Sequence, residues 1–422
     1  MPILLGCIAD DFTGATDLCN TLVRQGMRTV QAIGVPSRAE PPAGVDAVTI
    51  ALKSRTCPPE EAVTASLAAL AWLRDAGARQ ILFKYCSTFD STERGNIGPV
   101  ADALLETLGA DLAVVCPAFP ETGRTIYQGH LFVGDRLLSE THMRHHPLTP
   151  MTDSDLVRVM GRQSRRQVGL VPLAVVRRGA DAIRRRFAEL RASGVAYAVT
   201  DAVADEDLLR IGEACAEMAL VTGGSGIAMG LPANFRARGL LQATEPADAL
   251  PRVGGAGAVL AGSCSAATLA QVERMAAHHP ALRLDPLALA DGFDPSEVAA
   301  WAAARLDRGP VLVAASAPPE QVAAAQERLG RERAGSLVET ALAAVARELV
   351  GLGVRRLVVA GGETSGAVVQ ALGVEALRIG PQIDPGVPAT VTLGREPPLA
   401  LALKSGNFGG PDFFLKALAH LA

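Results

Sequence analysis

Polar side chains follow four apolar segments in the first third of the sequence. Asp10 and Asp11 follow residues 3–9, Lys53 and Arg55 follow 47–52, Lys84-Tyr85-Cys86-Ser87 follow 80–83, and the turn after 112–116 leads to Arg124. Lysine and arginine bind carboxylates through charge-assisted hydrogen bonds. Aspartate and asparagine accept or donate to sugar hydroxyls. These clusters therefore predict a binding site for a small molecule that carries a carboxylate and several hydroxyls, which is a sugar acid.

Lysine is rare in this chain, and its positions are therefore informative. The sequence has four lysines, and the other 36 basic residues are arginine; the lysines are Lys53, Lys84, Lys404 and Lys416. Three of them lie in segments rich in Gly, Ser or Thr. Lysine supplies a compact, strongly hydrated charge where arginine supplies a flat fork. The three segments are therefore candidates for ligand contact.

Asp11 is the predicted catalytic residue. An aspartate beside the reacting hydroxyl can act as a general base. Asp11 also stands where a helix is expected to begin, so a helix cap is the alternative role. Asn96, in the polar segment after Lys84, is predicted to bind sugar hydroxyls together with Asp10 or Asp11.

The second half of the sequence contains three glycine-rich turns, each after an apolar segment. They are residues 261–265, 361–366 and 404–410. Glycine lets backbone N–H groups approach phosphate oxygens, and a following helix N-terminus adds a favourable dipole. The turns predict a phosphate site, although similar turns also serve as plain strand-to-helix connections.

Several other kinds of site are excluded by the sequence. There is no Walker A motif, because no Gly-Lys pair occurs anywhere. The glycines at 223–226 lack the spacing of a nucleophile elbow. His142, His145 and His146 have no acidic or Cys partner at ligand spacing, which argues against zinc. The ligands of any metal stay unknown at this stage.

Alternating strand and helix patterns predict an α/β fold with two domains, each a mainly parallel sheet flanked by helices. A stretch rich in Pro, Gly and Ala at 241–256 predicts the boundary, with domains at 1–245 and 255–422. Strands are expected at 3–9, 29–34, 47–52, 80–83, 112–116, 168–175, 197–200, 219–222, 258–261, 311–314, 356–360, 390–393 and 399–403. Helices are expected at 15–25, 59–76, 98–108, 180–192, 205–218, 268–277 and 367–372.

Composition limits the partners and the compartment. The 422 residues carry a net charge of −4, with a pI near 6.0, so no basic surface favours nucleic acid. No run approaches the roughly 20 apolar residues that a membrane span needs, and the apolar start is too short for a signal peptide. Seven scattered cysteines fit a reducing compartment. A cytoplasmic protein is predicted, and a homodimer stays open.

Eight sequence blocks, in order, resemble those of the four-carbon acid sugar kinase family. They are IADDFTGATD (8–17), KYCSTFDSTERGNIGPV (84–100), CPAFPETGRTIYQG (116–129), PMTDSDL (150–156), GSCSAAT (262–268), GGETSGAVV (361–369), IDPGVP (383–388) and LKSGNFGG (403–410). The resemblance covers nearly the whole chain. Cys86 stands where relatives acting on threonate and erythronate tend to carry Asp. The sequence of residues 84–100 resembles that of the 3-oxo-tetronate 4-kinase branch.

The resemblance implies an ATP-dependent enzyme of carbohydrate metabolism, with a sugar-acid-binding N-terminal domain, a nucleotide-binding C-terminal domain and catalysis between them. It implies substrate contacts from Asp11, Arg55 and Lys84-Tyr85-Cys86-Ser87. It implies nucleotide contacts from Ser263, from Gly361, Gly362 and Glu363, and from Ser405 and Gly406. Lys404, Arg124 and Mg²⁺ are the candidates for neutralising phosphate charge.

The predicted reaction is therefore phosphorylation of the terminal hydroxyl of 3-oxo-tetronate, an alcohol-group phosphotransferase activity. Two alternatives remain. One is a D-threonate or D-erythronate kinase, and the other is a non-catalytic sugar-acid sensor that binds ATP.

Overall fold

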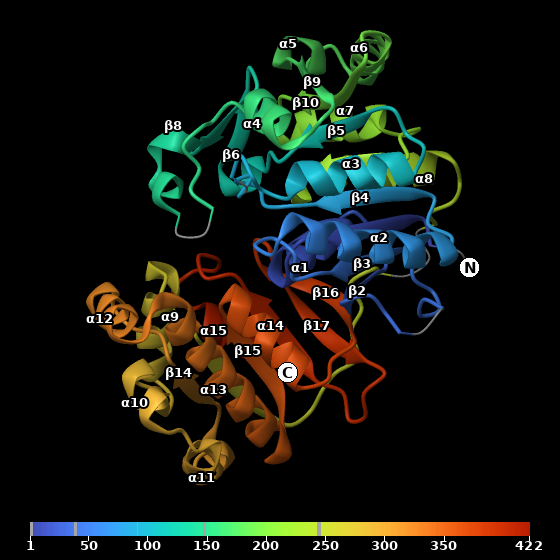
Figure 1. Cartoon of the computed structure of the whole chain (residues 1–422). Coiled ribbons are helices and arrows are strands. Elements are labelled where there is room, and N and C mark those ends of the chain that lie inside the picture. Colours follow the sequence, from blue (N-terminus) through green and yellow to red (C-terminus); the bar gives the residue numbers. More distant parts are fainter. Residues whose placement is uncertain (1–2, 38–39, 91, 147–148, 243–245) are drawn as a thin grey trace. The chain divides into compact units, whose positions relative to one another are not determined.

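The computed structural model describes residues 3–37, 40–90, 92–146, 149–242 and 246–422. The chain divides into two compact units, Met1–Ala247 and Asp248–Ala422, drawn in blue to yellow-green and in yellow to red in Figure 1. Each unit is a mainly parallel sheet flanked by helices, which confirms the predicted fold class.

The sheet of the first unit is parallel throughout, in the order β2-β3-β1-β4-β11-β5-β10-β9. Its central strands are fully buried on both faces, as continuous apolar runs require. The strands are β1 (Leu5–Ala9), β2 (Thr29–Ile33), β3 (Ala47–Ala51), β4 (Gln80–Lys84), β5 (Ala113–Cys116), β9 (Gln167–Val171), β10 (Val195–Thr200) and β11 (Leu220–Gly223).

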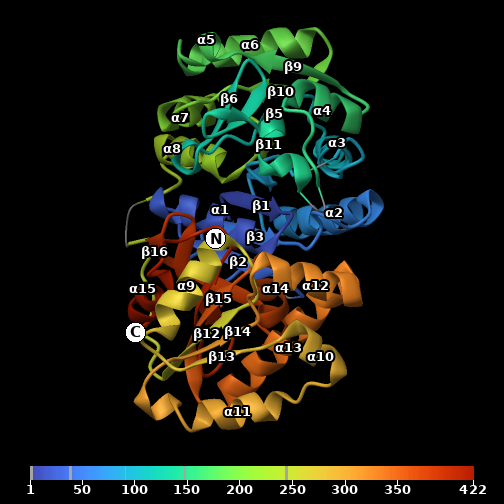
Figure 2. The same cartoon turned by 90° about the vertical axis from the view of Figure 1, so that its left-hand side faces the viewer.

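Helices cover both faces of this sheet. The helices α2, α3 and α4 pack in one layer, and α1, α6, α7 and α8 pack with the short helix η4 in the other, as Figure 2 shows. The helices are α1 (Phe12–Arg24), α2 (Pro59–Asp75), α3 (Ile97–Thr107), η1 (Pro120–Thr122), η2 (Leu138–Glu140), η3 (His142–His145), α4 (Leu156–Gln163), α5 (Leu173–Val176), α6 (Ala180–Ala192), α7 (Asp205–Ala214), η4 (Ser225–Gly230) and α8 (Leu231–Ala237).

The sheet of the second unit has the order β13-β14-β12-β15-β18-β17-β16. It is parallel from β13 to β18, whereas β17 runs antiparallel to both of its neighbours β18 and β16. The strands are β12 (Ala256–Ala261), β13 (Ala281–Arg283), β14 (Val311–Ala314), β15 (Val354–Ala360), β16 (Ala376–Asp384), β17 (Val387–Leu393) and β18 (Ala400–Lys404).

The helices of the second unit also form two layers. Val272 and Met275 of α9 and Phe413 and Phe414 of α15 pack against the inward side chains of the sheet in one buried core. The helices α13 and α14 cover the other face, with α10, α11 and α12 packed on α13 (Figure 2). The helices are α9 (Ala266–Ala276), α10 (Pro286–Asp291), α11 (Pro295–Ala303), η5 (Leu306–Arg308), α12 (Pro319–Leu329), α13 (Arg331–Gly351), α14 (Gly362–Ala371) and α15 (Phe413–His420).

Several predicted elements need correction. The strand expected at 168–175 ends at Val171, because Pro172 opens the helix α5 instead. Helix α1 begins at Phe12, directly after Asp11, rather than at Ala15. Helix α14 begins at Gly362, so the glycine-rich turn at 361–366 is already helical.

Five strands lie where the sequence predicted none. They are β13, β16 and all three strands of a small separate sheet, which consists of β6 (Arg124–Tyr127), β7 (His130–Val133) and β8 (Arg136–Leu137). Of the predicted linker at 241–256, residues 243–245 lie outside the described residues, and 246–255 have no helix or strand. No helix in the described ranges has the length and apolar composition that a membrane crossing requires.

Candidate active site

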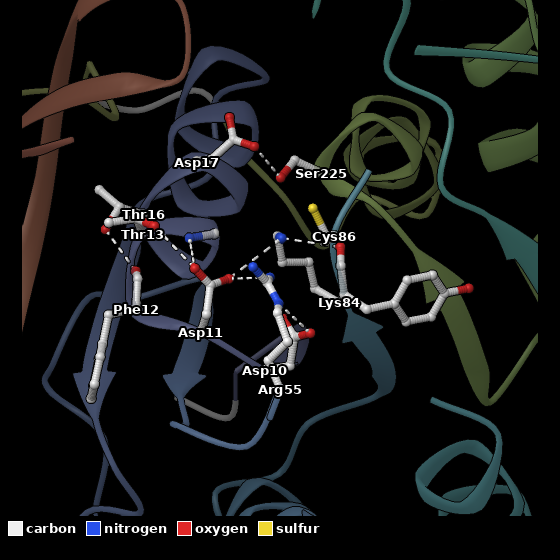
Figure 3. A network of polar contacts seen from close by, with 12 residues as sticks. Asp10, Asp11, Phe12, Thr13, Thr16, Asp17, Arg55, Lys84, Cys86 and Ser225 are labelled. Atoms are coloured by element: carbon white, nitrogen blue, oxygen red, sulfur yellow. Dashed lines mark hydrogen bonds and ion pairs between the residues drawn. The ribbon is translucent and has the colours of Figure 1, made fainter. Parts of the chain in front are cut away.

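The carboxyl ends of neighbouring parallel strands meet at one edge of the first sheet. Strand β1 lies between β3 and β4. Asp10 and Asp11 follow β1, Arg55 follows β3, and Lys84 is the last residue of β4. Figure 3 shows these side chains turned toward one another. The structure therefore brings together Asp11, Arg55 and Lys84, three of the residues predicted to form the sugar-acid site.

Arg55 bridges the two aspartates. Its Nε and Nη2 donate to Oδ2 and Oδ1 of Asp10 at 2.9 and 2.8 Å, and Nη2 contacts Oδ1 of Asp11 at 2.5 Å. The amide of Asn96 donates to the carbonyls of Ser54 and Arg55. Bidentate pairing fixes orientation as well as charge. Asp10 and Asn96 therefore hold Arg55 in place, and the Asn96 amide group is committed to this loop.

Asp11 caps helix α1 and remains charged. Its Oδ2 accepts hydrogen bonds from the Thr13 hydroxyl at 3.0 Å and the Gly14 N–H at 3.1 Å. Burial acts to raise the pKa of Asp11, but Arg55, Lys84 and these two hydrogen bonds together hold the pKa below its ordinary value. A general base works best with a pKa near the working pH. Asp11 therefore does cap the helix, which was the alternative role that the sequence allowed. A carboxylate with a lowered pKa is better suited to binding a ligand than to accepting a proton.

Lys84 is a buried cation with spare hydrogen-bonding capacity. Its residue is 3% exposed, and its Nζ donates to the Tyr85 carbonyl at 3.1 Å and lies 4.0 Å from Oδ1 of Asp11. A lysine ammonium has three donors. A Cβ at Gly14 would overlap both the Lys84 ammonium and the Asp11 carboxylate, so glycine at this helical position leaves the space that Lys84 occupies.

Asp17 and Ser225 belong to the same edge of the sheet, and neither was predicted from the sequence. The Ser225 hydroxyl, just after β11, donates to Oδ2 of Asp17 on α1 at 2.5 Å (Figure 3). The contact joins residues 208 positions apart, so no local pattern predicts it. One signal was available, because Asp17 is the only charged residue from Phe12 to Val23, a segment almost wholly buried in the structure.

The segment after Lys84 has side chains in different environments. The Tyr85 ring is fully buried between Phe83 and Phe89, and its hydroxyl bonds to Thr222 at 2.9 Å. Its backbone N–H donates to the Gly223 carbonyl at 2.9 Å and its own carbonyl accepts from Lys84, so both the ring and the backbone of Tyr85 are engaged within the protein. The Cys86 thiol is half-buried, 3.0 Å from the Thr88 hydroxyl, and burial raises the pKa of Cys86 to about 11, so it stays a neutral thiol.

Two further predicted residues, Ser87 and Arg124, are only partly buried. Arg124 begins β6, where its Nη1 donates to the Thr122 carbonyl. Its Nε is buried without a hydrogen-bond partner among the described residues. A buried guanidinium donor without an acceptor is costly, so Arg124 offers a donor to an anionic group.

The three glycine-rich turns of the second unit follow adjacent parallel strands. The turn at 262–265 follows β12, Gly361 follows β15, and Ser405 and Gly406 follow β18. Ser263 N donates to the Ala360 carbonyl at 3.1 Å, and a Cβ at Gly406 would overlap the Ser263 hydroxyl. The predicted phosphate turns therefore lie together at the carboxyl edge of this sheet.

A cavity of about 400 Å³ opens beside two of these turns. This volume is within the range of small-molecule sites, roughly 300–1,000 Å³. One part is lined by Gly262, Ser263 and 361–364, and these residues include the N-terminus of α14. Another part is apolar, lined by residues that include Ala315, Ala317, Val322, Ala325 and Val338. A polar, glycine-rich end and an apolar end suit the phosphates and the base of a nucleotide.

Lys404 is fully buried beneath these turns. Its Nζ donates to the Thr268 hydroxyl at 2.9 Å, to Oε1 of Gln271 at 2.9 Å and to the Gly406 carbonyl at 2.8 Å. All three donors are therefore engaged within the protein. Burial lowers the pKa of Lys404 to about 7, while three acceptors favour its charged form. This geometry favours a role in positioning the Ser405–Gly406 turn over direct contact with phosphate.

No cluster of three or more His, Cys, Asp or Glu side chains in the described part of the chain is placed to hold a metal ion. Two acidic residues, Glu339 and Glu363, nevertheless line the cavity. Magnesium at nucleotide sites is held by one or two carboxylates, by the phosphates and by water. The carboxylates at the cavity therefore fit a nucleotide-bound magnesium ion.

Two family models match successive parts of the chain. Residues 5–231 match a sugar-binding N-terminal domain family, and residues 258–414 match a nucleotide-binding C-terminal domain family. The 3-oxo-tetronate kinases of Cupriavidus necator and Pseudomonas fluorescens are 62% and 63% identical to this chain, each over 99% of it and 97% of their own length. A crystal structure from Salmonella typhimurium LT2 is 43% identical and covers 98% of both chains, with a TM-score of 0.88.

The two family models and the relatives at 62% and 63% identity define the class of this protein. It is a small-molecule kinase that uses a nucleotide. The chain belongs to the four-carbon acid sugar kinase family. The predicted family, the predicted class of enzyme and the predicted use of ATP are thereby confirmed.

Proposed function

We propose that this protein transfers the γ-phosphoryl group of ATP to the terminal (4-) hydroxyl of 3-oxo-tetronate. The observation that carries the choice of substrate is similarity at 62% and 63% identity, over 99% of this chain, to proteins named 3-oxo-tetronate kinase. The geometry agrees, because one unit carries buried cations suited to an acid and the other a cavity suited to a nucleotide.

In this proposal residues 1–245 bind the sugar acid and residues 255–422 bind the nucleotide. The substrate carboxylate accepts hydrogen bonds from the unused donors of Lys84, with Arg55 adding positive charge. Asp11 accepts from a substrate hydroxyl, and Cys86 and Ser87 line the same site, while Tyr85 contributes by accepting the hydrogen bond that positions Lys84. Arg124 supplies a further donor to an anionic group.

The nucleotide phosphates bind the backbone N–H groups of the turns at Ser263, at Gly361-Gly362 and at Ser405-Gly406. The N-terminus of α14 adds the dipole that favours anions. Magnesium accompanies the nucleotide, held by its phosphates and by Glu363 or Glu339. When bound, it neutralises charge on the phosphate oxygens.

A turnover panel separates this proposal from its alternatives. Purified protein is supplied with ATP, Mg²⁺ and, in separate reactions, 3-oxo-tetronate, D-threonate and D-erythronate, and ADP release is followed. The highest kcat/KM is expected with 3-oxo-tetronate. A higher value with either hydroxy acid indicates the sister activity, and ATP binding without turnover on any acid indicates a sensor.

The cytoplasm stays the predicted compartment, because ATP is available there and a reducing compartment keeps thiols free. All seven cysteines are free in the structure. A homodimer also stays a prediction, which light scattering of the purified protein would test.

Lys84→Met is expected to raise the KM for the sugar acid by about 10- to 100-fold, since a charged hydrogen bond contributes about 1.5–3 kcal/mol. Methionine keeps the length of the buried side chain. The Kd for ATP should stay within about twofold, because the predicted nucleotide contacts are all in the other unit.

Stability measurements identify the competing role of Lys84 as a partner of Asp11. If the lysine only neutralises Asp11, the variant loses melting temperature while the KM ratio between sugar acid and ATP stays unchanged. Unchanged kinetics together with an unchanged melting temperature would contradict both roles.

Gly406→Ala is expected to raise the Kd for ATP by about tenfold while leaving the KM of the sugar acid nearly unchanged. The added Cβ would overlap the Ser263 hydroxyl and lie 3.2 Å from that of Ser265, so the two turns must separate. Isothermal titration with ATP measures the effect.

Gly254→Ala is the matched control, since a Cβ there meets no atom within 4 Å. Equal ATP affinity in the two variants would remove Gly406 from the nucleotide site. ATP contacts confined to residues before 250 in a nucleotide-bound structure would overturn the assignment of the whole unit.

A further inference from the structure

One buried acid at the sugar-acid site has no part in the binding scheme above. Asp17, on α1, is 7% exposed. Its Oδ2 accepts the hydrogen bond from Ser225, whereas its Oδ1 is buried and has no hydrogen-bond partner among the described residues. Buried carboxylate oxygens in folded proteins are nearly always hydrogen-bonded. Such an exception calls for a ligand or a chemical role.

The other two acids of this edge are already occupied. Both oxygens of Asp10 accept from the Arg55 guanidinium. One oxygen of Asp11 contacts Arg55, and the other accepts from Thr13 and Gly14. Of these three aspartates, Asp17 alone has a carboxylate oxygen without any hydrogen-bond partner among the described residues.

The surroundings of Asp17 also bring its titration toward neutral pH. Burial raises the pKa of Asp17 to about 6, while Lys84 on β4 and the Ser225 hydroxyl act against this rise. Two further acids face the same carboxylate and add to the rise, Asp11 at the start of α1 and Glu121 in η1. A carboxylate that titrates just below neutral pH is mostly ionised at pH 7 and still accepts a proton readily.

We propose that Asp17 is the proton acceptor of the reaction, with Ser225 positioning its carboxylate. This inference rests on the proposed kinase function. The 4-hydroxyl of the substrate donates to Oδ1 of Asp17 and so supplies the missing partner. As the hydroxyl oxygen forms its bond to the γ-phosphorus, its proton passes to Oδ1. The bond from the γ-phosphorus to the bridging oxygen breaks, its electron pair leaves with ADP, and Asp17 later returns the proton to solvent.

Asp17→Asn tests the proton-accepting role. Asparagine keeps the shape and can still accept from Ser225, but it cannot take up the proton. We expect kcat to fall by about 10²- to 10⁴-fold, the usual contribution of a general base. The Kd for ATP should stay within about twofold. In the wild type, kcat should fall as the pH drops through about 6, where Asp17 becomes protonated, and this acid limb should be absent in the variant.

Ser225→Ala gives a second readout that a structural role would not produce. The Ser225 hydrogen bond stabilises ionised Asp17 and so lowers its pKa. Removing a bond of about 1 kcal/mol should move the acid limb of kcat to higher pH by about 0.7 unit. Ser66→Ala, a buried serine on α2 whose hydroxyl has no partner in the described residues, should leave the limb in place.

The outcomes separate this inference from the function on which it rests. Wild-type turnover combined with near-normal kcat in Asp17→Asn overturns the role of Asp17 and leaves the kinase function intact. The absence of wild-type turnover on every four-carbon acid overturns both. If Asp17→Asn does not fold, Ser225→Ala decides, and loss of stability without a shift of the acid limb reduces the pair to a structural contact.

Discussion

Asp11→Asn is expected to lower kcat/KM for the sugar acid by about 10²-fold or more, since charged hydrogen bonds contribute about 1.5–3 kcal/mol each and several depend on this carboxylate. Asparagine caps a helix about as well as aspartate, so the bonds from Thr13 and Gly14 survive. The negative charge that orients Arg55 and Lys84 is lost. Steady-state kinetics with varied sugar acid, and melting temperature, measure the two effects.

Asp155→Asn is the control for this substitution, because Asp155 caps α4 in the same unit and also pairs with an arginine, Arg158. It should leave kcat/KM unchanged. The acid limb of the pH profile should persist in Asp11→Asn, since the pKa of Asp11 is held below its ordinary value. Near-normal turnover in Asp11→Asn would reduce the residue to a helix cap.

The parallel strands were the most predictable part of the fold. Strands such as β1, β3 and β4 are buried on both faces, so their sequences are uninterrupted apolar runs that end where polar residues begin. The strand ends of a parallel sheet share one edge. For this reason the meeting of Asp11, Arg55 and Lys84 followed from the sequence.

Other strands carry no such signal. Strand β16 contains Pro381 and has irregular register between Ile379 and Gln382, and proline argues against a strand in sequence reasoning. Strands β6, β7 and β8 are at most four residues long and only partly buried. Their pairing depends on tertiary contacts that periodicity cannot reveal.

At the site, residue type was predictable but side-chain environment was not. Lys84 and Lys404 both end buried parallel strands beside polar turns. Within the part of the chain that the structure describes, the ammonium of Lys84 makes one hydrogen bond and that of Lys404 makes three. The difference arises from Thr268 and Gln271, more than 130 positions away in the sequence. Local sequence therefore identified both lysines as site candidates without separating binding from positioning.

Lys404→Met is expected to lower the free energy of unfolding of the second unit by about 3–5 kcal/mol, because three buried acceptors lose their donor at about 1–3 kcal/mol each, a loss that removal of the buried charge partly offsets. The variant leaves acceptors on Thr268, Gln271 and Gly406 without their donor. Gln271 also donates to the carbonyls of 408–410, so the whole loop loses its anchor.

Lys416→Met supplies the matched comparison, because Lys416 pairs with Asp384 in the same unit while its side chain is 40% exposed. Exposed pairs contribute about 0–1 kcal/mol. In a unit of this size the melting temperature changes by about 2–4 °C per kcal/mol, so Lys404→Met should melt at least about 6 °C below the wild type and Lys416→Met within a few degrees of it. Thermal unfolding of the full chain followed by circular dichroism gives both values.

ATP affinity should fall with Lys404→Met alone, because the Ser405–Gly406 turn rests on this lysine. Equal melting temperatures for the two variants, or loss of ATP binding with unchanged stability, would contradict the positioning role and return Lys404 to direct phosphate contact.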